Sequence, residues 1–243
     1  TAKAQRPARE AQTPAKRGGA GGATLADPPV VINAPLDFEL KELQTGHPYL
    51  RDCGLLPKTI EHFGLGYCGR GMLQDRIAIP LHDAAGRLIG YAGRLIDERQ
   101  VSAQNPKYKF PAPRLRNNRV LELRPELFLY NGWRIQKPIK DLIVVQGFES
   151  VWWLWQHGYP DVVSVMGSSC SEEQGELLVD LVDVHGTVWA FMDGSDNGRR
   201  CAASVLLTVG RYRSVRHVPL ADGERSTDCS AEDLGALLAG SGQ

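Results

Sequence analysis

The 243-residue sequence has no long apolar run and no net charge, with 28 basic and 28 acidic residues. None of its apolar stretches approaches the ~20 residues that a helix needs to cross a bilayer. The first residues also lack the apolar core of a secretory signal. These absences predict a protein that works in the cytoplasm and has no membrane partner.

Cysteine is sparse and scattered. The five cysteines include no C-x-x-C pair, so the sequence predicts no zinc site and no redox pair, and it favours a reducing compartment. Cys170 lies in a loop beside the site predicted below. We expect it to be a small buried thiol rather than a nucleophile.

The balanced total hides an uneven distribution of charge. Residues 38–136 hold 15 basic and 10 acidic side chains, whereas residues 137–243 hold 8 basic and 15 acidic ones. A basic unit joined to an acidic one is typical of a protein that grips a polyanion with one of its halves. The sequence therefore favours a nucleic-acid partner.

Two apolar segments each run into a turn rich in glycine and polar residues, at 142–150 and 187–200. Continuous apolar runs of this length are typical of strands that are buried on both faces. In an open α/β sheet ligands bind at the carboxyl ends of the strands, so we expect the two turns to form one site. Between them the pattern predicts a helix at 151–157, a strand at 161–166 and a helix at 171–183, which gives a β-α-β-α-β order and a parallel sheet.

The rest of the chain divides into three parts. Residues 1–36 are rich in Ala, Gly, Pro and basic residues, and we expect a disordered linker. Residues 37–138 predict a small basic α+β subdomain, and residues 139–243 the α/β domain with a closing segment. The expected elements outside the central pattern are helices at 47–50 and from Pro57, a hairpin of strands 76–81 and 88–94 around a turn at 83–86, a last strand at 215–220 and a closing helix at 231–238.

Three motifs carry a resemblance to a known family: V-V-Q-G-F at 144–148, M-G-S-S-C-S-E-E-Q at 166–174 and M-D-G-S-D-N-G-R-R at 192–200. Together they resemble the Toprim domain of bacterial DNA primases, especially the primase-like Toprim proteins of mobile elements. The upstream motifs at 75–83, 86–94 and 106–109 are similar to the basic amino-terminal part of the primase core. The resemblance implies a Toprim α/β domain preceded by a primase-type α+β subdomain, with a groove between them.

The sequence departs from that family at its acidic positions. Toprim enzymes place carboxylates where Gln146, Ser150 and Ser195 stand here, and Asp193 is the motif acid that remains in register. Mg²⁺ or Mn²⁺ needs anionic oxygen ligands, and two-metal phosphoryl transfer needs several of them together. We therefore expect weak metal binding at most, through Asp193 and Asp196.

One alternative keeps a catalytic site. Glu149 and Asp196 lie close to the emptied positions, so Asp193, Asp196 and Glu149 could form a shifted acid set. The competing interpretation, which we favour, makes Glu149 a solvated carboxylate of a first helical turn and Asp196 part of an ordinary turn.

The resemblance also implies the nucleic-acid contacts. Arg76 and Arg94 match basic positions of the primase groove, and Lys107 and Tyr108 match the family's P-K-Y motif. Guanidinium groups pair with phosphate, and a tyrosine ring stacks on bases. The full set predicted to bind nucleic acid is Arg76, Arg94, Lys107, Tyr108, Lys109, Arg199 and Arg200.

These observations predict a protein that binds single-stranded DNA or a primer–template in replication or transfer of a mobile element, with metal-dependent polymerase activity impaired or lost. The first alternative is an active primase that makes RNA primers with the shifted acid set. The second is a non-catalytic module that contacts replication or transfer proteins.

Overall fold

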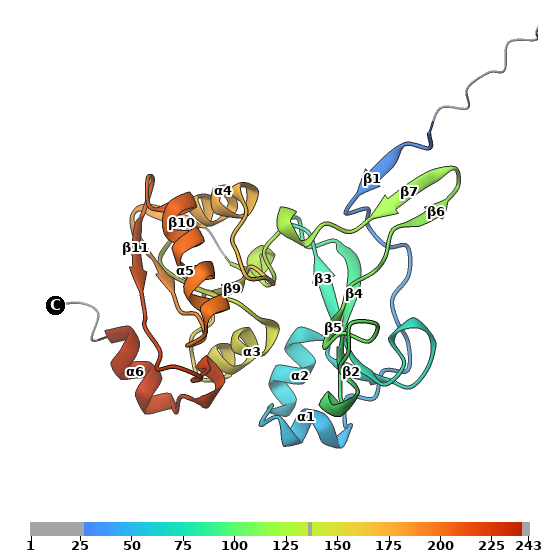
Figure 1. The fold of residues 1–243 in the computed structure, drawn as a ribbon, viewed down its shortest axis with the longest axis horizontal. Coiled ribbons are helices and arrows are strands. Elements are labelled where there is room, and N and C mark those ends of the chain that lie inside the picture. Colours follow the sequence, from blue (N-terminus) through green and yellow to red (C-terminus); the bar gives the residue numbers. More distant parts are fainter. Residues whose placement is uncertain (1–26, 136–137, 240–243) are drawn as a thin grey trace, which may run out of the picture.

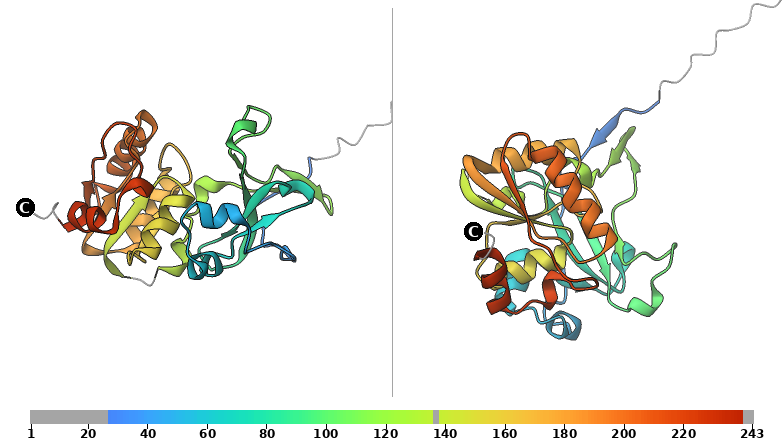
Figure 2. Two further views of the ribbon diagram at one scale, coloured as in Figure 1. Left: turned by 90° about the horizontal axis from the view of Figure 1, so that it is seen from below. Right: turned by 60° about the vertical axis from the view of Figure 1, so that its left-hand side comes forward.

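The computed structural model describes residues 27–135 and 138–239. The chain forms two halves that lie side by side, with the first described residues at one end and the last helix, α6 (Ala231–Ala239), at the other (Figures 1 and 2). Among the described residues no helix is both long and apolar enough to span a membrane.

The carboxyl-terminal half is built on a parallel sheet. Its strand order is β11 (Ser214–His217), β10 (Val182–Ala190), β8 (Ile139–Val145) and β9 (Val162–Ser164), and every neighbouring pair is parallel. The predicted β-α-β-α-β order is confirmed by β8, α3 (Phe148–Gln156), β9, α4 (Glu172–Leu181) and β10, and α5 (Asp196–Val209) then leads to β11.

Strand β8 is buried on both faces, as its apolar run predicts. Leu142 and Val144 belong to the core beneath α4 and α5, whereas Ile143 and Val145 belong to the core that α3 shares with the amino-terminal half. All four side chains are buried. The strand therefore lies between two hydrophobic layers, which holds the turn that follows it in a fixed place.

Three elements of the parallel sheet half end at other residues than predicted. Strand β9 stops at Ser164 rather than 166, and Met166 takes a left-handed conformation with φ 58°. Helix α4 ends at Leu181 rather than 183 because β10 begins at once, with an irregular register between Val182 and Thr187. Strand β11 covers 214–217 instead of the predicted 215–220.

The amino-terminal half contains an antiparallel sheet in the order β2 (Gly66–Cys68), β3 (Arg76–His82), β4 (Leu88–Leu95) and β5 (Tyr108–Lys109). The predicted hairpin is β3–β4. Its turn is held by the Asp83 carboxylate, which accepts hydrogen bonds from the Ala85 and Arg87 amides, and Gly86 supplies a φ of 77°. Two short helices, α1 (Pro48–Asp52) and α2 (Pro57–Phe63), precede the sheet, as predicted.

A second small sheet was not predicted. Strand β1 (Val30–Ile32) pairs in parallel with β7 (Arg119–Glu122), which forms a hairpin with β6 (Arg114–Arg116). The predicted disordered linker 1–36 is thus wrong at its end, because β7 supplies hydrogen-bond partners that the local composition does not reveal; residues 1–26 lie outside the described residues. The short 3₁₀ helices are η1 (Gly71–Leu73), η2 (Glu98–Gln100), η3 (Pro125–Leu127), η4 (Gly132–Arg134) and η5 (Ser226–Asp228).

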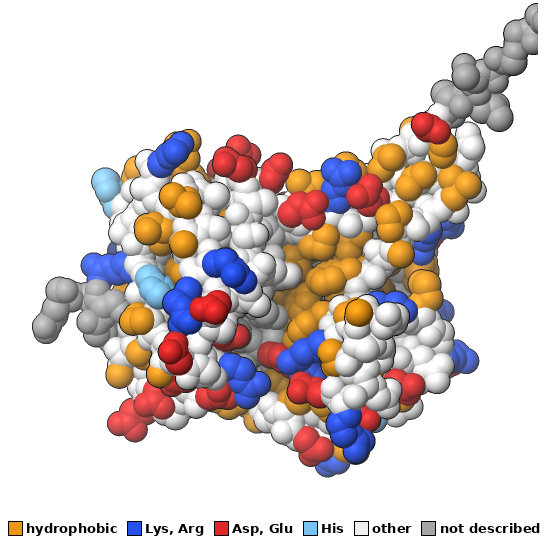
Figure 3. Space-filling model, viewed as in Figure 1, with side chains coloured by type: hydrophobic (Ala, Val, Ile, Leu, Met, Phe, Trp, Pro, Cys, Tyr) orange, Lys and Arg blue, Asp and Glu red, His pale blue; other side chains and the backbone are white. Residues whose placement is uncertain are grey.

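One hydrophobic core joins the halves. Phe148 of α3 contacts the rings of Tyr108, Phe110, Tyr130 and Trp152. Above this shared core the surface is hollowed between the halves, with hydrophobic side chains in the hollow and charged ones on its lips (Figure 3). The chain therefore has a continuous core and an open groove on one face.

Candidate functional site

The two glycine turns lie at the same edge of the parallel sheet. Strands β8 and β10 are neighbours with Val144 opposite Ala190, so Gln146-Gly147 and Asp193-Gly194 follow them side by side. A third segment, 220–226, closes on the second turn: the Gly223 amide donates to the Gly194 carbonyl at 2.7 Å, and the Gly194 amide donates to the Glu224 carbonyl at 2.8 Å. A Cβ at Gly194 would lie 1.7 Å from the Ala221 carbonyl oxygen, so this close approach requires glycine.

Asp193 is the acid at the centre of this edge. Its Oδ1 accepts a hydrogen bond from the Ser226 amide at 3.4 Å. Burial raises the pKa of the Asp193 carboxyl, and the nearby Arg225 guanidinium offsets part of that rise. The site thus keeps one half-buried carboxylate that is held mainly by the backbone.

The three positions predicted to have lost their acids carry neutral groups with structural roles. The Ser226 hydroxyl donates to Ser150 Oγ at 2.7 Å, and both side chains are buried. Ser195 is the N-cap of α5, where its Oγ accepts a hydrogen bond from the Gly198 amide at 3.0 Å. Gln146 is half-buried, and its main-chain carbonyl accepts a hydrogen bond from the Ser164 hydroxyl. The two serine oxygens are therefore engaged within the protein.

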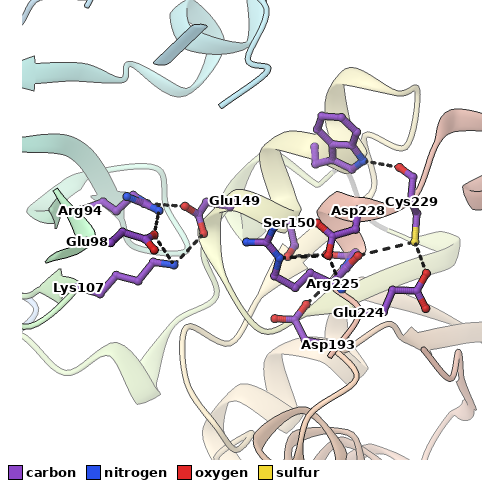
Figure 4. Close-up of polar contacts among 12 residues, drawn as sticks. Arg94, Glu98, Lys107, Glu149, Ser150, Asp193, Glu224, Arg225, Asp228 and Cys229 are labelled. Atoms are coloured by element: carbon purple, nitrogen blue, oxygen red, sulfur yellow. Dashed lines mark hydrogen bonds and ion pairs between the residues drawn. The ribbon is translucent and has the colours of Figure 1, made fainter. Parts of the chain in front are cut away.

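The two shifted acids each form an ion pair with an arginine. Asp196 is exposed and forms an ion pair with Arg199 at 2.7 Å. Glu149 forms an ion pair with Arg94 and lies 3.9 Å from Lys107, on the side of the amino-terminal half (Figure 4). Within residues 27–135 and 138–239, no group of three or more His, Cys, Asp or Glu side chains is arranged to hold a metal ion.

Arg76 is bonded within the amino-terminal half, so its terminal nitrogens are not free to contact a phosphate. Its side chain is buried, and its Nη1 donates to the carbonyls of Gly93, Pro106 and Lys107 at 2.9–3.3 Å. Its Nη2 donates to Asn105. The expectation that this guanidinium faces the groove is wrong, because the loop before β5 folds over it and uses all of these donors.

Arg94 is also buried, but it links the two halves. Its Nη1 donates to the Leu95 carbonyl at 2.7 Å, its Nη2 to Glu98 at 2.8 Å and its Nε to Glu149. Burial by itself would lower the pKa of Arg94, but the Glu149 carboxylate together with Tyr49 and Tyr108 outweighs burial, and the pKa lies above its ordinary value. Arg94 is therefore a charged, fully bonded side chain at the boundary between the halves.

The other residues predicted to bind nucleic acid differ in how exposed their side chains are. Lys107 lies 3.3 Å from Glu98, and its side chain is 36% exposed. The Tyr108 hydroxyl is enclosed, and its ring packs on Phe148 instead of facing solvent, so burial raises the pKa of Tyr108. Lys109, Arg199 and Arg200 are exposed on the surface.

Two cavities flank these elements. One of about 250 Å³ is lined by α1, β4, α3 and the 225–227 segment, and includes Arg94, Glu149 and Arg225. A larger one, about 720 Å³, lies in the amino-terminal half beneath the small sheet and is mostly apolar. The smaller cavity is the one that adjoins the charged boundary, so it is the one relevant to the site.

Comparisons with known proteins agree with this architecture. No family model matches the chain. The DNA primase of Aquifex aeolicus is 29% identical over 88% of this chain and 49% of that protein, and the DNA primase of Legionella pneumophila is 33% identical over 67% and 32%. The chain spans about half or less of the length of these curated relatives.

Solved structures show the same fold. A crystal structure of the Aquifex aeolicus primase, with its zinc-binding and RNA polymerase domains, superposes with a TM-score of 0.65 at 23% identity over 79% of this chain and 54% of the other. A primase catalytic domain bound to single-stranded DNA also superposes with a TM-score of 0.65, at 22% identity over 82% of this chain and 74% of the other. This chain is a primase-like Toprim protein. The predicted fold and family are thereby confirmed.

For a primase-like Toprim protein Mg²⁺ or Mn²⁺ is the expected ion, but the groups present at this edge fit such an ion poorly. Two of the available oxygens are serine hydroxyls engaged in internal hydrogen bonds, and the half-buried Asp193 has a raised pKa. A hard divalent cation needs several anionic oxygens in one place. The single acid at this edge does not supply them.

The sequence also left one important residue unrecognised. Arg225 belongs to the segment that closes on the Asp193 turn, and it pairs with Asp228 at 2.8 Å. It interacts electrostatically with both Asp193 and Glu149. The available signal was a basic residue in the polar turn that follows the last predicted strand. This primase-like protein thus carries a positive charge beside its remaining acid.

Proposed function

We propose that this protein binds single-stranded DNA or a primer–template junction in the replication or transfer of a mobile element, and that its metal-dependent polymerase activity is impaired or lost. The homology to DNA primases supports a nucleic-acid role. The structure of a related catalytic domain with single-stranded DNA supports the choice of ligand.

The proposed loss of polymerase activity rests on one observation. Serines stand at two positions where an acid is expected. Ser150 accepts a buried hydrogen bond from Ser226, and Ser195 caps helix α5. A polymerase site of this kind would need carboxylates there to hold its metal ions. Binding of a polyanion does not need them, because cations and stacking groups supply it.

The exposed cations bind phosphate groups in this proposal. Lys107 pairs with Glu98 and Glu149, Lys109 is the exposed last residue of β5, and Arg199 and Arg200 lie near the start of α5. Removing one cation that neutralises a phosphate should lower the slope of log K against log salt by about 0.7 for a single strand. We therefore expect Lys109→Gln to weaken binding and reduce this slope, whereas Lys58→Gln makes the same charge change at an exposed position of α2 that lines neither cavity and should leave the slope unchanged.

The test of the function is binding of a labelled single-stranded oligonucleotide in Mg²⁺ and in EDTA, with nucleotide incorporation followed in the same Mg²⁺ samples. We expect equal binding in both buffers and no incorporation. Incorporation that disappears in Asp193→Ala would instead establish an active primase with the shifted set Asp193, Asp196 and Glu149. No binding in either buffer would reject the proposal and favour a module that contacts replication or transfer proteins.

A further inference from the structure

Two cations form ion pairs with the Glu149 carboxylate, and a third, Arg225, lies close enough to interact with it electrostatically. Arg94 comes from β4, Lys107 from the loop before β5 and Arg225 from the segment that follows β11. Figure 4 shows Glu149 with Arg94 and Lys107 on one side and Arg225 on the other. An acidic side chain at this point has the surroundings that a bound phosphate group would have.

The cations are held in place before any ligand arrives. The Arg94 side chain is only 6% exposed, and its guanidinium lies 5.0 Å from the centre of the Tyr49 ring. Arg225 is fixed by two hydrogen bonds to the Asp228 carboxylate. Guanidinium groups that are already oriented lose little side-chain entropy when they bind an anion.

Four carboxylates surround these three cations. Glu98 lies against Arg94 and Lys107, Asp228 and Asp193 lie near Arg225, and Glu149 interacts with all three cations. A phosphate can therefore enter only if one carboxylate leaves. Glu149 is the one shared by all of the cations, and it adjoins the 250 Å³ cavity that Arg94 and Arg225 also line.

We infer that Glu149 is an internal anion that occupies a phosphate-binding site formed by Arg94, Lys107 and Arg225, and that a nucleic-acid or nucleotide phosphate must displace it. This inference rests on the proposed function and adds its regulation. The Glu149 carboxylate competes with the ligand phosphate for the same cations. It therefore weakens the binding of ligands that make few contacts besides this phosphate. The site needs no divalent cation, because Arg225 supplies a positive charge near Asp193.

The experiment compares Glu149→Gln with Glu173→Gln. Glu149 is the second residue of α3 and Glu173 the second residue of α4, so both variants remove one carboxylate from the same position of a first helical turn. Glu173 is exposed, and no ion pair of the described residues includes it. Each protein is titrated in EDTA with a deoxythymidine oligonucleotide and, separately, with ATP.

We expect Glu149→Gln to raise the affinity for the oligonucleotide or for ATP about fivefold. This is the effect of one weak ion pair, which the ligand no longer has to break. Glu173→Gln should stay within about twofold of the unchanged protein. Adding Arg225→Gln to the Glu149→Gln variant should cancel most of the gain, because the third cation is then missing. As Arg225 is exposed, Arg225→Gln alone keeps the fold and should weaken binding.

The outcomes separate the two proposals. A gain with the oligonucleotide supports the inference with a strand phosphate as the ligand, and a gain confined to ATP supports it with a free nucleotide. If the unchanged protein binds the oligonucleotide and Glu149→Gln binds no better, the inference is overturned while the proposed function stands. If neither the unchanged protein nor any variant binds oligonucleotide or ATP, both are overturned.

Discussion

At the scale of single residues, Asp193 differs from the serines beside it. Ser150 and Ser226 satisfy one another with a hydrogen bond, so their burial costs little. Asp193 receives a single backbone hydrogen bond and its pKa is raised, which means that its ionised form is less favourable in the folded protein than in the unfolded one. This carboxylate therefore lowers the free energy of unfolding at neutral pH.

The sign of that effect gives a prediction. Because the folded-state pKa of Asp193 is above its unfolded value, the stability linked to its proton is present below about pH 4 and is lost as the pH rises through the raised pKa. Asp193→Asn keeps an acceptor for the Ser226 amide and removes the charge. We expect it to be more stable than the unchanged protein at neutral pH, by up to about 1 kcal/mol.

The measurement is urea unfolding at several pH values. The advantage of Asp193→Asn should shrink to nothing as the pH falls below about 4. Asp180→Asn, an exposed change on α4, should show no such trend. An advantage that is constant at all pH values would contradict an effect of ionisation.

At the scale of elements, helices α4 and α5 of the Toprim half begin with side-chain caps. Ser171 and Gln174 form a capping box at the start of α4, in which each side chain bonds to the other residue's amide. The Gln174 amide nitrogen also donates to the carbonyls of Pro125, Phe128 and Val165, and so ties the helix to the segment before β8. A local sequence signal thus sets both a helix start and a long-range contact.

Removal of this cap should be measurable. Ser171→Ala loses the bond to the Gln174 amide and the hydrogen bond to the Glu126 carbonyl, so we expect a loss of about 1–2 kcal/mol in the free energy of unfolding. Ser168→Ala lies in the same loop at an exposed position and should change stability by less than about 0.5 kcal/mol. Chemical denaturation followed by circular dichroism compares the two; equal effects would show that the cap is not the source of stability.

At the scale of the whole molecule, one of the two hydrophobic cores is shared by both halves. Phe63 and Tyr130 lie 6.0 Å apart between their ring centres, and Tyr130 packs against Phe148 of the Toprim half at 4.8 Å. The Arg94–Glu149 pair crosses the same boundary. The halves should therefore unfold together, although the sequence divides them into a basic and an acidic unit.

Phe148→Ala tests this coupling. The cavity left in the shared aromatic cluster should cost about 3–5 kcal/mol, while the transition stays single because the cavity weakens the packing of both halves at once. Leu207→Ala, on the exposed face of α5, should change stability by less than about 0.5 kcal/mol. Tryptophan fluorescence and far-ultraviolet circular dichroism should give the same midpoint, and two separate transitions would show independent halves.

Local patterns explain what the sequence predicts well. The apolar run before Gln146, the glycine turns and the Asp83 turn each depend on neighbouring residues, so the parallel sheet and the hairpin follow from them. The missed hairpin β6–β7 also had a local signal, since Asn117 and Asn118 both take positive φ in its turn. Its pairing with β1 had none, because the partner strands are far apart in the chain.

By itself the sequence determined the family, the β-α-β-α-β order of the carboxyl-terminal half and the neutral side chains at 146, 150 and 195. The tertiary structure alone decided what the neighbouring charges do. Arg94 and Glu149 are 55 residues apart, and Ser150 and Ser226 are 76 apart. Whether a guanidinium is buried like Arg76 or pairs with an acid across a domain boundary depends on which distant segments pack against it, and local periodicity carries no information about that packing.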